Sequence, residues 1–137
     1  MPIENAPFSQ SEYDRRVAVV RKAMERAGID VLFVTDPSNQ AWLTGYDGWS
    51  FYVHQGVILG MEGAPIWWGR HMDMLGGRRT CWMEEEDILG YGDHYIQSTV
   101  YHPMQDLAEQ LQARGYWNAR LGVEMENYYY SAKAHQV

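Results

Sequence analysis

The sequence contains one cysteine, no long apolar run and no surplus of basic residues, and each shortage excludes a class of protein. Cys81 has no second cysteine with which to form an intrachain disulfide. No apolar run approaches the roughly 20 residues that a membrane-spanning helix needs, and the N-terminus lacks the basic and then apolar pattern of a secretory signal. We therefore expect a soluble cytoplasmic protein with no membrane partner.

The formal net charge is −7 at pH 7, because 18 acidic residues outnumber 11 basic ones. Binding to nucleic acid depends on a basic surface, so we expect no nucleic-acid partner. The acidic run from Glu84 to Asp87 is typical of a solvated turn, with a cation site as the alternative.

Aromatic residues are abundant, with 6 Trp and 10 Tyr in 137 residues. That length suits one domain, and a hydrophobic content of 46% suits a packed core. Some of these large rings must be partly exposed, and exposed aromatic side chains mark binding surfaces or interfaces with partner chains. The alternative is that the rings only cap a small core.

The short motifs of several enzyme classes are missing. The sequence has no G-x-S-x-G, no H-E-x-x-H and no G-x-x-x-x-G-K-[ST], and its five His are not at zinc-ligand spacings. Gly45 and Gly48 follow a predicted helix rather than a strand, which does not fit a dinucleotide fingerprint. Cys81, beside Trp82, is expected to be a buried and inert thiol. We therefore predict no metal ion, no cofactor and no complete catalytic apparatus in these residues.

Hydrophobic periodicity predicts an α/β fold, with a mixed sheet flanked by helices on both faces. Ser9 and Asp36 are predicted helix N-caps, while Gly28 and Gly45 are predicted helix ends. The predicted elements are, in order, a helix at 9–28, a strand at 29–34, a short helix at 36–45, a long strand at 49–59, an antiparallel return at 66–68, a short Met-rich helix from 71 that Gly76 and Gly77 end, a weak strand at 88–91, a helix at 103–115, a strand at 121–125 and a helix beginning at Tyr128.

The stretch from Ser38 to Gly60 carries most of the candidate site residues. Read with a period of 2, residues 49–59 form one strand with two unequal faces. The polar face offers hydroxyl, phenol and imidazole groups, which suit the lining of a polar pocket, and the alternative is an edge strand whose polar face meets water. The polar face holds Ser50, Tyr52 and His54, and the face that needs a core holds Trp49, Phe51, Val53, Val57 and Leu59, interrupted by Gln55.

Three side chains have the chemistry best suited to binding. His54 suits the role of acid, base or hydrogen-bond donor, and the alternative is a structural histidine. Arg70 and His71 follow a predicted strand end and suit the binding of a carboxylate, with a solvent-facing pair as the alternative. His94 and His102 have no sequence context that sets them apart from surface residues.

Residues 30–49 resemble the amino-terminal domain of the creatinase/prolidase family of hydrolases. The resemblance is carried by a D-x-x-N pattern at Asp36 to Asn39 and a [YW]-L-[ST]-G-[YFW] motif at Trp42 to Tyr46. The order of the predicted elements also matches the family. The resemblance implies that residues 1–137 form one such domain, with a ribonuclease H-like architecture.

The resemblance also implies a division of labour within a longer hydrolase. In the family a carboxy-terminal domain carries the chemistry and any metal ligands, so the present chain is expected to be a fragment without catalytic residues. In the family the amino-terminal domain helps to form the homodimer, and in several members it lends side chains to the active site of the neighbouring subunit. Here the candidates for that role are Trp49, Tyr52 and His54; the match does not extend to Arg70 and His71, which are inferred from their chemistry alone.

Residues 35–57 point to a branch of the family that opens the ring of a small zwitterionic substrate. The creatinase and Xaa-Pro dipeptidase branches are the alternatives. A free-standing module that dimerises and binds a ligand, or serves as a scaffold, is an alternative from a different class.

Overall fold

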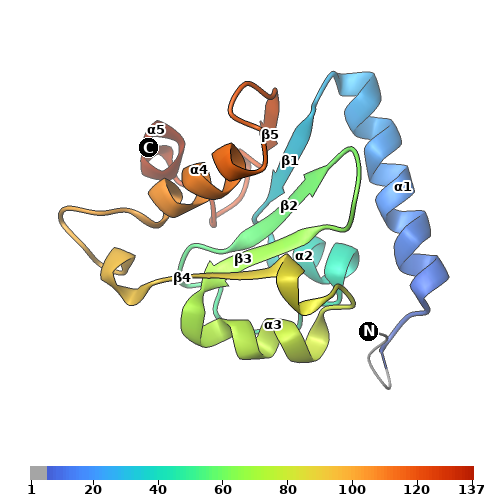
Figure 1. Ribbon diagram of the computed structural model, residues 1–137, viewed down its shortest axis with the longest axis horizontal. Coiled ribbons are helices and arrows are strands. Elements are labelled where there is room, and N and C mark those ends of the chain that lie inside the picture. The colour runs from blue at the N-terminus through green and yellow to red at the C-terminus, as the bar shows by residue number, and fades with distance from the viewer. Residues whose placement is uncertain (1–5) are drawn as a thin grey trace.

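The computed structural model describes residues 6–137, which fold around a five-stranded mixed sheet (Figure 1). The strand order is β4-β3-β2-β1-β5. Strand β2 pairs antiparallel with both β1 and β3, whereas β5 runs parallel to β1 and β4 runs parallel to β3. The α/β class and the mixed sheet expected from the sequence are confirmed. The strands are β1 (Val31–Val34), β2 (Gly56–Gly60), β3 (Ile66–Arg70), β4 (Ile88–Tyr91) and β5 (Leu121–Val123).

Helices cover both faces of the sheet, again as predicted. Helices α1, α2 and α3 lie on one side, and α4 and α5 lie on the other (Figure 1). None of the helices within residues 6–137 is long and apolar enough to cross a membrane. The helices are α1 (Gln10–Ala27), α2 (Pro37–Thr44), α3 (Met74–Thr80), α4 (Pro103–Ala113) and α5 (Ala132–Gln136), with short 3-10 turns at His71–Asp73, Glu85–Asp87 and Asp93–Tyr95.

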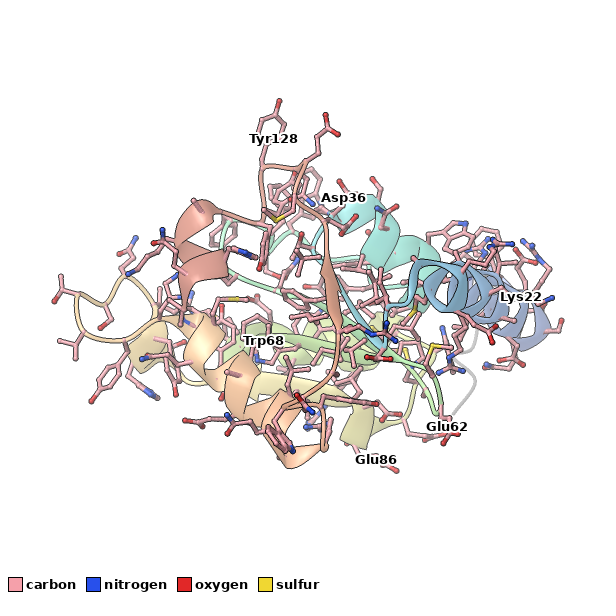
Figure 2. All side chains as sticks on the ribbon, turned by 90° about the horizontal axis from the view of Figure 1, so that it is seen from above. Lys22, Asp36, Glu62, Trp68, Glu86 and Tyr128 are labelled. Atoms are coloured by element: carbon pink, nitrogen blue, oxygen red, sulfur yellow. The ribbon has the colours of Figure 1, made fainter. Side chains whose placement is uncertain are left out.

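Alternating side chains of the sheet form two separate cores. Val57 and Trp67 pack with α1 and α2, whereas Ile58 and Trp68 pack with α4 and α5. Both Trp side chains have an exposed fraction of 0%, and Trp68 lies in the interior (Figure 2). Its indole Nε1–H donates to the Asp106 carboxylate over 2.7 Å, which ties β3 to α4 without leaving a buried donor unpaired.

The helix ends follow the sequence closely because they depend on local chemistry. Ser9 caps α1 by accepting a backbone N–H through its side chain, and Asp36 caps α2 by accepting two. Gly28 and Gly45 end these helices with φ values of 67° and 80°, where a side chain would be strained. At Gly45 a Cβ would also lie 2.8 Å from the Tyr13 hydroxyl.

The long strand predicted at residues 49–59 is wrong in its first half. Strand β2 begins only at Gly56, and residues 49–55 form a loop. The two-face pattern fails with it, because Trp49 is 81% exposed and Ser50 is buried. The Ser50 side chain bonds to Tyr46 and Gln55 inside the loop, and such local side-chain bonds compete with a strand ladder.

Two helix boundaries also differ from the prediction. Gly76 and Gly77 do not end the Met-rich helix, because α3 runs through both to Thr80. Gly77 faces the sheet, where a Cβ would lie 2.9 Å from Ile88, so the glycine permits close packing rather than ending the helix. The final helix begins after Ser131, which caps it, and not at Tyr128.

Candidate functional site

A cavity of about 510 Å³ opens beside the end of β3. Its walls are the loop before β2 (52–54), Arg70 at the end of β3, and the segment between β4 and α4 (95–98 and 101–103). Of the five residues predicted from the sequence, the structure brings Tyr52, His54 and Arg70 together in this cavity. Trp49 and His71 lie outside its lining, and both are exposed.

The imidazole rings of His54 and His102 meet within the cavity. Their centroids are 4.6 Å apart, with an angle of 66° between the ring planes. The backbone of His54 is held by the Tyr91 hydroxyl, which donates to its carbonyl oxygen over 2.5 Å. Nδ1 of His102 accepts the backbone N–H of Met104 over 3.2 Å and so caps α4. A neutral His102 therefore carries its proton on Nε2.

Both histidines are harder to protonate than an exposed imidazole. Burial lowers the pKa of His54 below its usual value of 6.5, and the neighbouring His102 lowers it further. Burial also lowers the pKa of His102, and the charge of Lys133 adds to that effect. The cavity thus holds two neutral imidazoles in contact at neutral pH.

Arg70 is fixed in place by an acidic neighbour. Its Nε–H donates to Asp93 over 2.7 Å, which raises the pKa of Arg70 and lowers the pKa of Asp93. Within residues 6–137, the two terminal nitrogens of Arg70 make no hydrogen bond. The guanidinium is therefore oriented by one carboxylate and has its terminal N–H groups free for a ligand.

The segment between β4 and α4 supplies the wall that the sequence did not reveal. Gln97 has a φ of 50° and is the one non-glycine residue among those described with a positive φ. Such backbone strain gathers at binding sites. Ser98 accepts the backbone N–H groups of Val100 and Tyr101 through its hydroxyl, which holds the segment in a tight turn.

His102 and Tyr101 are cavity residues that the sequence analysis missed. One signal was available for His102, because a polar residue directly before Pro103 at a helix start is a candidate N-cap with a fixed side chain. No pattern marks Tyr101 or Gln97, since the segment has neither a period of 2 nor a period of 3.6.

An exposed aromatic rim borders the cavity. A second hollow, of about 210 Å³, shares residues 52–54 with it and is completed by Phe51, Tyr128, Tyr129 and Ser131. The ring of Phe51 lies 5.7 Å from that of Trp49 and 5.8 Å from that of Tyr129. Tyr128 is fully exposed and points away from the body of the molecule (Figure 2). We use the name aromatic rim for Trp49, Phe51, Tyr52, Tyr128 and Tyr129.

The D-x-x-N motif is structural. Oε1 of Glu124, just after β5, accepts the backbone N–H groups of Thr35 and Asp36 over 2.6 and 2.9 Å. Its other oxygen, Oε2, accepts Nδ2 of Asn39 over 2.6 Å. Together with the cap that Asp36 places on α2, these bonds fix the turn between β1 and α2 to the sheet edge.

The second motif also builds the frame of the site rather than its lining. Thr44 donates through Oγ1 to the carbonyl oxygen of Gln40 and accepts the N–H of Tyr46, closing the end of α2. The Tyr46 hydroxyl bonds to Ser50 over 2.6 Å, and Ser50 donates to Oε1 of Gln55 over 2.5 Å. This buried chain spans the base of the loop that carries Tyr52 and His54, so it sets where those side chains lie.

Neither a metal site nor a reactive thiol is found among the described residues. Within residues 6–137, no group of three or more His, Cys, Asp and Glu side chains is placed to hold a metal ion. Cys81 is buried, as expected, and burial raises the pKa of its thiol to about 12. A thiol that stays protonated at neutral pH is a poor nucleophile.

The fold and the motif residues define a class of protein. The chain belongs to the creatinase/prolidase N-terminal domain family, whose model matches residues 16–136. This confirms the resemblance inferred from the two motifs. Within the family, residues 35–57 resemble ectoine hydrolase. The chain is 56% identical to an ectoine hydrolase of Halomonas elongata over 131 residues, which are 95% of this chain and 33% of that protein.

Other relatives agree on the family and the fold. An uncharacterized hydrolase/peptidase of Sinorhizobium fredii, y4tM, is 39% identical over 129 residues, which are 93% of this chain and 33% of that protein. The chain thus spans about a third of the length of the curated relatives it matches. Among solved structures, the N-terminal domain of an Xaa-Pro dipeptidase from Lactobacillus brevis superposes with a TM-score of 0.70 at 14% identity, covering 88% of this chain and 83% of that one.

Proposed function

We propose that this chain encloses the substrate in a dimeric hydrolase that opens the ring of ectoine, a small zwitterion. The observation that carries the proposal is the cavity, in which Tyr52, His54 and Arg70 meet beside the loop that follows the second motif. The 56% identity to an ectoine hydrolase supports the choice of substrate. The role of these residues is to bind and cover the substrate, while the bond is broken by residues outside this chain.

Each side chain of the cavity suits one part of a zwitterion. The free terminal nitrogens of Arg70 suit a carboxylate, and His54 suits a hydrogen bond to a polar atom next to it. The faces of Tyr52 and Tyr101 suit a delocalised cation. Ser50, which the sequence placed on the same face as Tyr52, has its hydroxyl committed within the buried chain and takes no part in the cavity.

The aromatic rim supports the proposed dimer. Trp49 is 81% exposed, Tyr52 is 73% exposed and Tyr128 is fully exposed, and they belong to one rim, whereas the exposed Trp117 lines a different hollow. Aromatic side chains are enriched at the buried centres of interfaces between subunits. Because Tyr52 belongs to both the rim and the cavity, a second subunit seated on the rim would also lie beside the cavity.

The proposal is tested in the full-length product of the gene that encodes this chain. We expect His54→Ala to raise KM for ectoine or to lower kcat, with little loss of stability. His71→Ala is the matched control, because His71 is exposed and lies outside the cavity lining. Unchanged kinetics in His54→Ala would remove His54 from the site. The 137-residue chain alone is expected to show no turnover, and measured turnover would contradict the enclosing role.

Two alternatives are each favoured by one observation. Structural likeness to Xaa-Pro dipeptidase domains favours a peptidase. Turnover of an Xaa-Pro dipeptide but not of ectoine by the full-length protein would establish that activity. Turnover of creatine would instead indicate the creatinase branch. The exposed aromatic rim favours a free-standing module that dimerises and binds a ligand. An open reading frame that continues well past Val137 contradicts that module, whereas a stop codon there supports it. Action in the cytoplasm, without a cofactor held by this chain, remains part of our proposal.

A further inference from the structure

We propose that the cavity binds a carboxylate group and that the pair of His54 and His102 takes up one proton from solvent as the carboxylate enters. The inference deepens the proposed function, on which it rests only in taking this cavity as the one that faces a substrate. It names the chemical group that the cavity recognises and makes its recognition sensitive to pH.

Arg70 supplies the first part of the site. Its Nε is already bonded to Asp93, and its side chain is only 22% exposed. The guanidinium is planar, so this one bond also sets the direction of the terminal N–H groups, which have no protein partner within residues 6–137. Because Arg70 lines the cavity, these paired donors are placed for the two oxygens of a carboxylate.

The histidine pair supplies the second part. Nδ1 of His102 is committed to the N–H of Met104, so Nε2 is its free nitrogen. The ring nitrogens of His54 make no hydrogen bond to any residue in 6–137. Since the ring centroids are 4.6 Å apart, two imidazolium charges would repel each other strongly, and the pair gains one proton rather than two.

The charges around the pair explain why the proton arrives with the ligand. Arg70 reaches the cavity from β3, and Lys133 acts on His102 from α5. Asp93 is already paired with Arg70, Asp73 also acts on Arg70, and Asp106 and Glu109 act on Tyr95 in the cavity wall. Within residues 6–137, none of these carboxylates is hydrogen-bonded to His54 or His102.

Without a ligand, burial and positive neighbours hold the pKa of both His54 and His102 below the usual value. A bound carboxylate places a negative charge beside the pair and raises the pKa of the imidazole nearest to it. Binding that takes up one proton strengthens as the pH falls, by at most about tenfold per pH unit. Carboxylate affinity is therefore expected to rise from pH 8 towards pH 6.

The test follows the five histidines of the 137-residue chain by NMR during a pH titration. The titration is run in sodium acetate and again in sodium chloride of equal ionic strength. We expect acetate to raise the midpoint of His54 or His102 by about half a pH unit or more, with His135 as an internal reference that does not move. The proposal would be overturned if His54 and His102 each had the same midpoint in acetate as in chloride. An equal shift of all five histidines would overturn it as well.

Variants separate the site from general charge effects. Arg70→Met is expected to abolish the acetate effect, while Arg78→Met, which removes an exposed charge from α3, keeps it. His102→Asn retains a good helix N-cap but removes the second ring, so the midpoint of His54 in acetate is expected to rise further. An acetate effect that survives in Arg70→Met would contradict the assigned site.

Ectoine as a second titrant distinguishes this inference from the proposed function. The same midpoint rise with ectoine supports both, because ectoine carries a carboxylate. A rise with acetate and none with ectoine keeps the carboxylate site and contradicts ectoine as its ligand. No rise with either contradicts the carboxylate site alone, and the turnover assay of the full-length protein then decides the proposed function independently.

Discussion

Ser50 offers a direct test of how the frame positions the cavity. Its hydroxyl lies between the Tyr46 hydroxyl, 2.6 Å away, and Oε1 of Gln55, 2.5 Å away. All three residues have an exposed fraction of 4%. Because the hydroxyl has one hydrogen, which it donates to Gln55, it accepts the hydrogen of Tyr46. Ser50→Ala removes both bonds at once and leaves two buried polar atoms without partners.

The expected cost follows from those two atoms. Each buried polar group that loses its partner costs about 1–3 kcal/mol, so Ser50→Ala is expected to lower the free energy of unfolding by roughly 2–6 kcal/mol. Nε2 of Gln55 already lacks a partner, so the amide has no compensating bond within the described residues. Tyr46→Phe leaves the bond between Ser50 and Gln55 intact and is expected to cost less, about 1–2 kcal/mol.

Guanidinium denaturation of the 137-residue chain, followed by Trp fluorescence, measures both variants and the double variant. The double variant is expected to cost less than the sum of the single ones, since both remove the same bond. Ser38→Ala is the control, because Ser38 is an exposed residue of α2, and a change within about 0.5 kcal/mol is expected there. An equally small change in Ser50→Ala would refute the assigned role of the buried chain.

Three further predictions concern stability and reactivity. Glu124→Ala is expected to lower the free energy of unfolding by roughly 2–4 kcal/mol, because three hydrogen bonds to a carboxylate are lost; the exposed Glu126→Ala is its control in the same denaturation assay, and equal midpoints would contradict the role of Glu124. Cys81 is expected to resist alkylation in the native chain at pH 8, since its pKa is about 12, and rapid labelling by iodoacetamide would contradict its burial. The free energy of unfolding is expected to fall from pH 7 to pH 5. The pKa values of His54 and His102 are lower in the folded chain than in the unfolded chain, so the unfolded chain binds more protons as the pH falls. If a His54→Gln/His102→Asn variant kept the same dependence of stability on pH, the histidine pair would not be its cause.

The parts of the fold that the sequence predicted are those fixed by near neighbours. The side chains of Ser9 and Asp36 bond to backbone groups two or three residues away, and Gly45 adopts the positive φ that ends α2. Each feature can therefore be predicted from a short stretch of sequence. The loop at 49–55 could not be predicted, because its apolar and polar residues alternate as they do in a strand. Only the buried partners of Ser50 show that its hydroxyl belongs to the interior.

The candidate site could be predicted from the sequence only in part. His54 and Arg70 stood out by chemical type, and both line the cavity. His102 pairs with His54 only because the fold brings the start of α4 against the loop before β2. The sequence of neither segment predicts that contact. Trp49 was predicted as a site residue from its place after the motif, and the structure puts it on the aromatic rim rather than in the cavity. Its role in binding stays a prediction.

The two motifs that reveal the family lie in the framework, whereas most of the cavity wall comes from residues 52–54, 95–98 and 101–103, with Arg70 of β3 completing it. The two motifs therefore indicate the fold of a chain, and they do not indicate which ligand its cavity binds. We expect these wall segments to tolerate exchange between relatives, because the hydrogen bonds of both motifs lie outside them. Grafting these segments from one relative into another is then a practical route to transferring ligand preference without redesigning the interior.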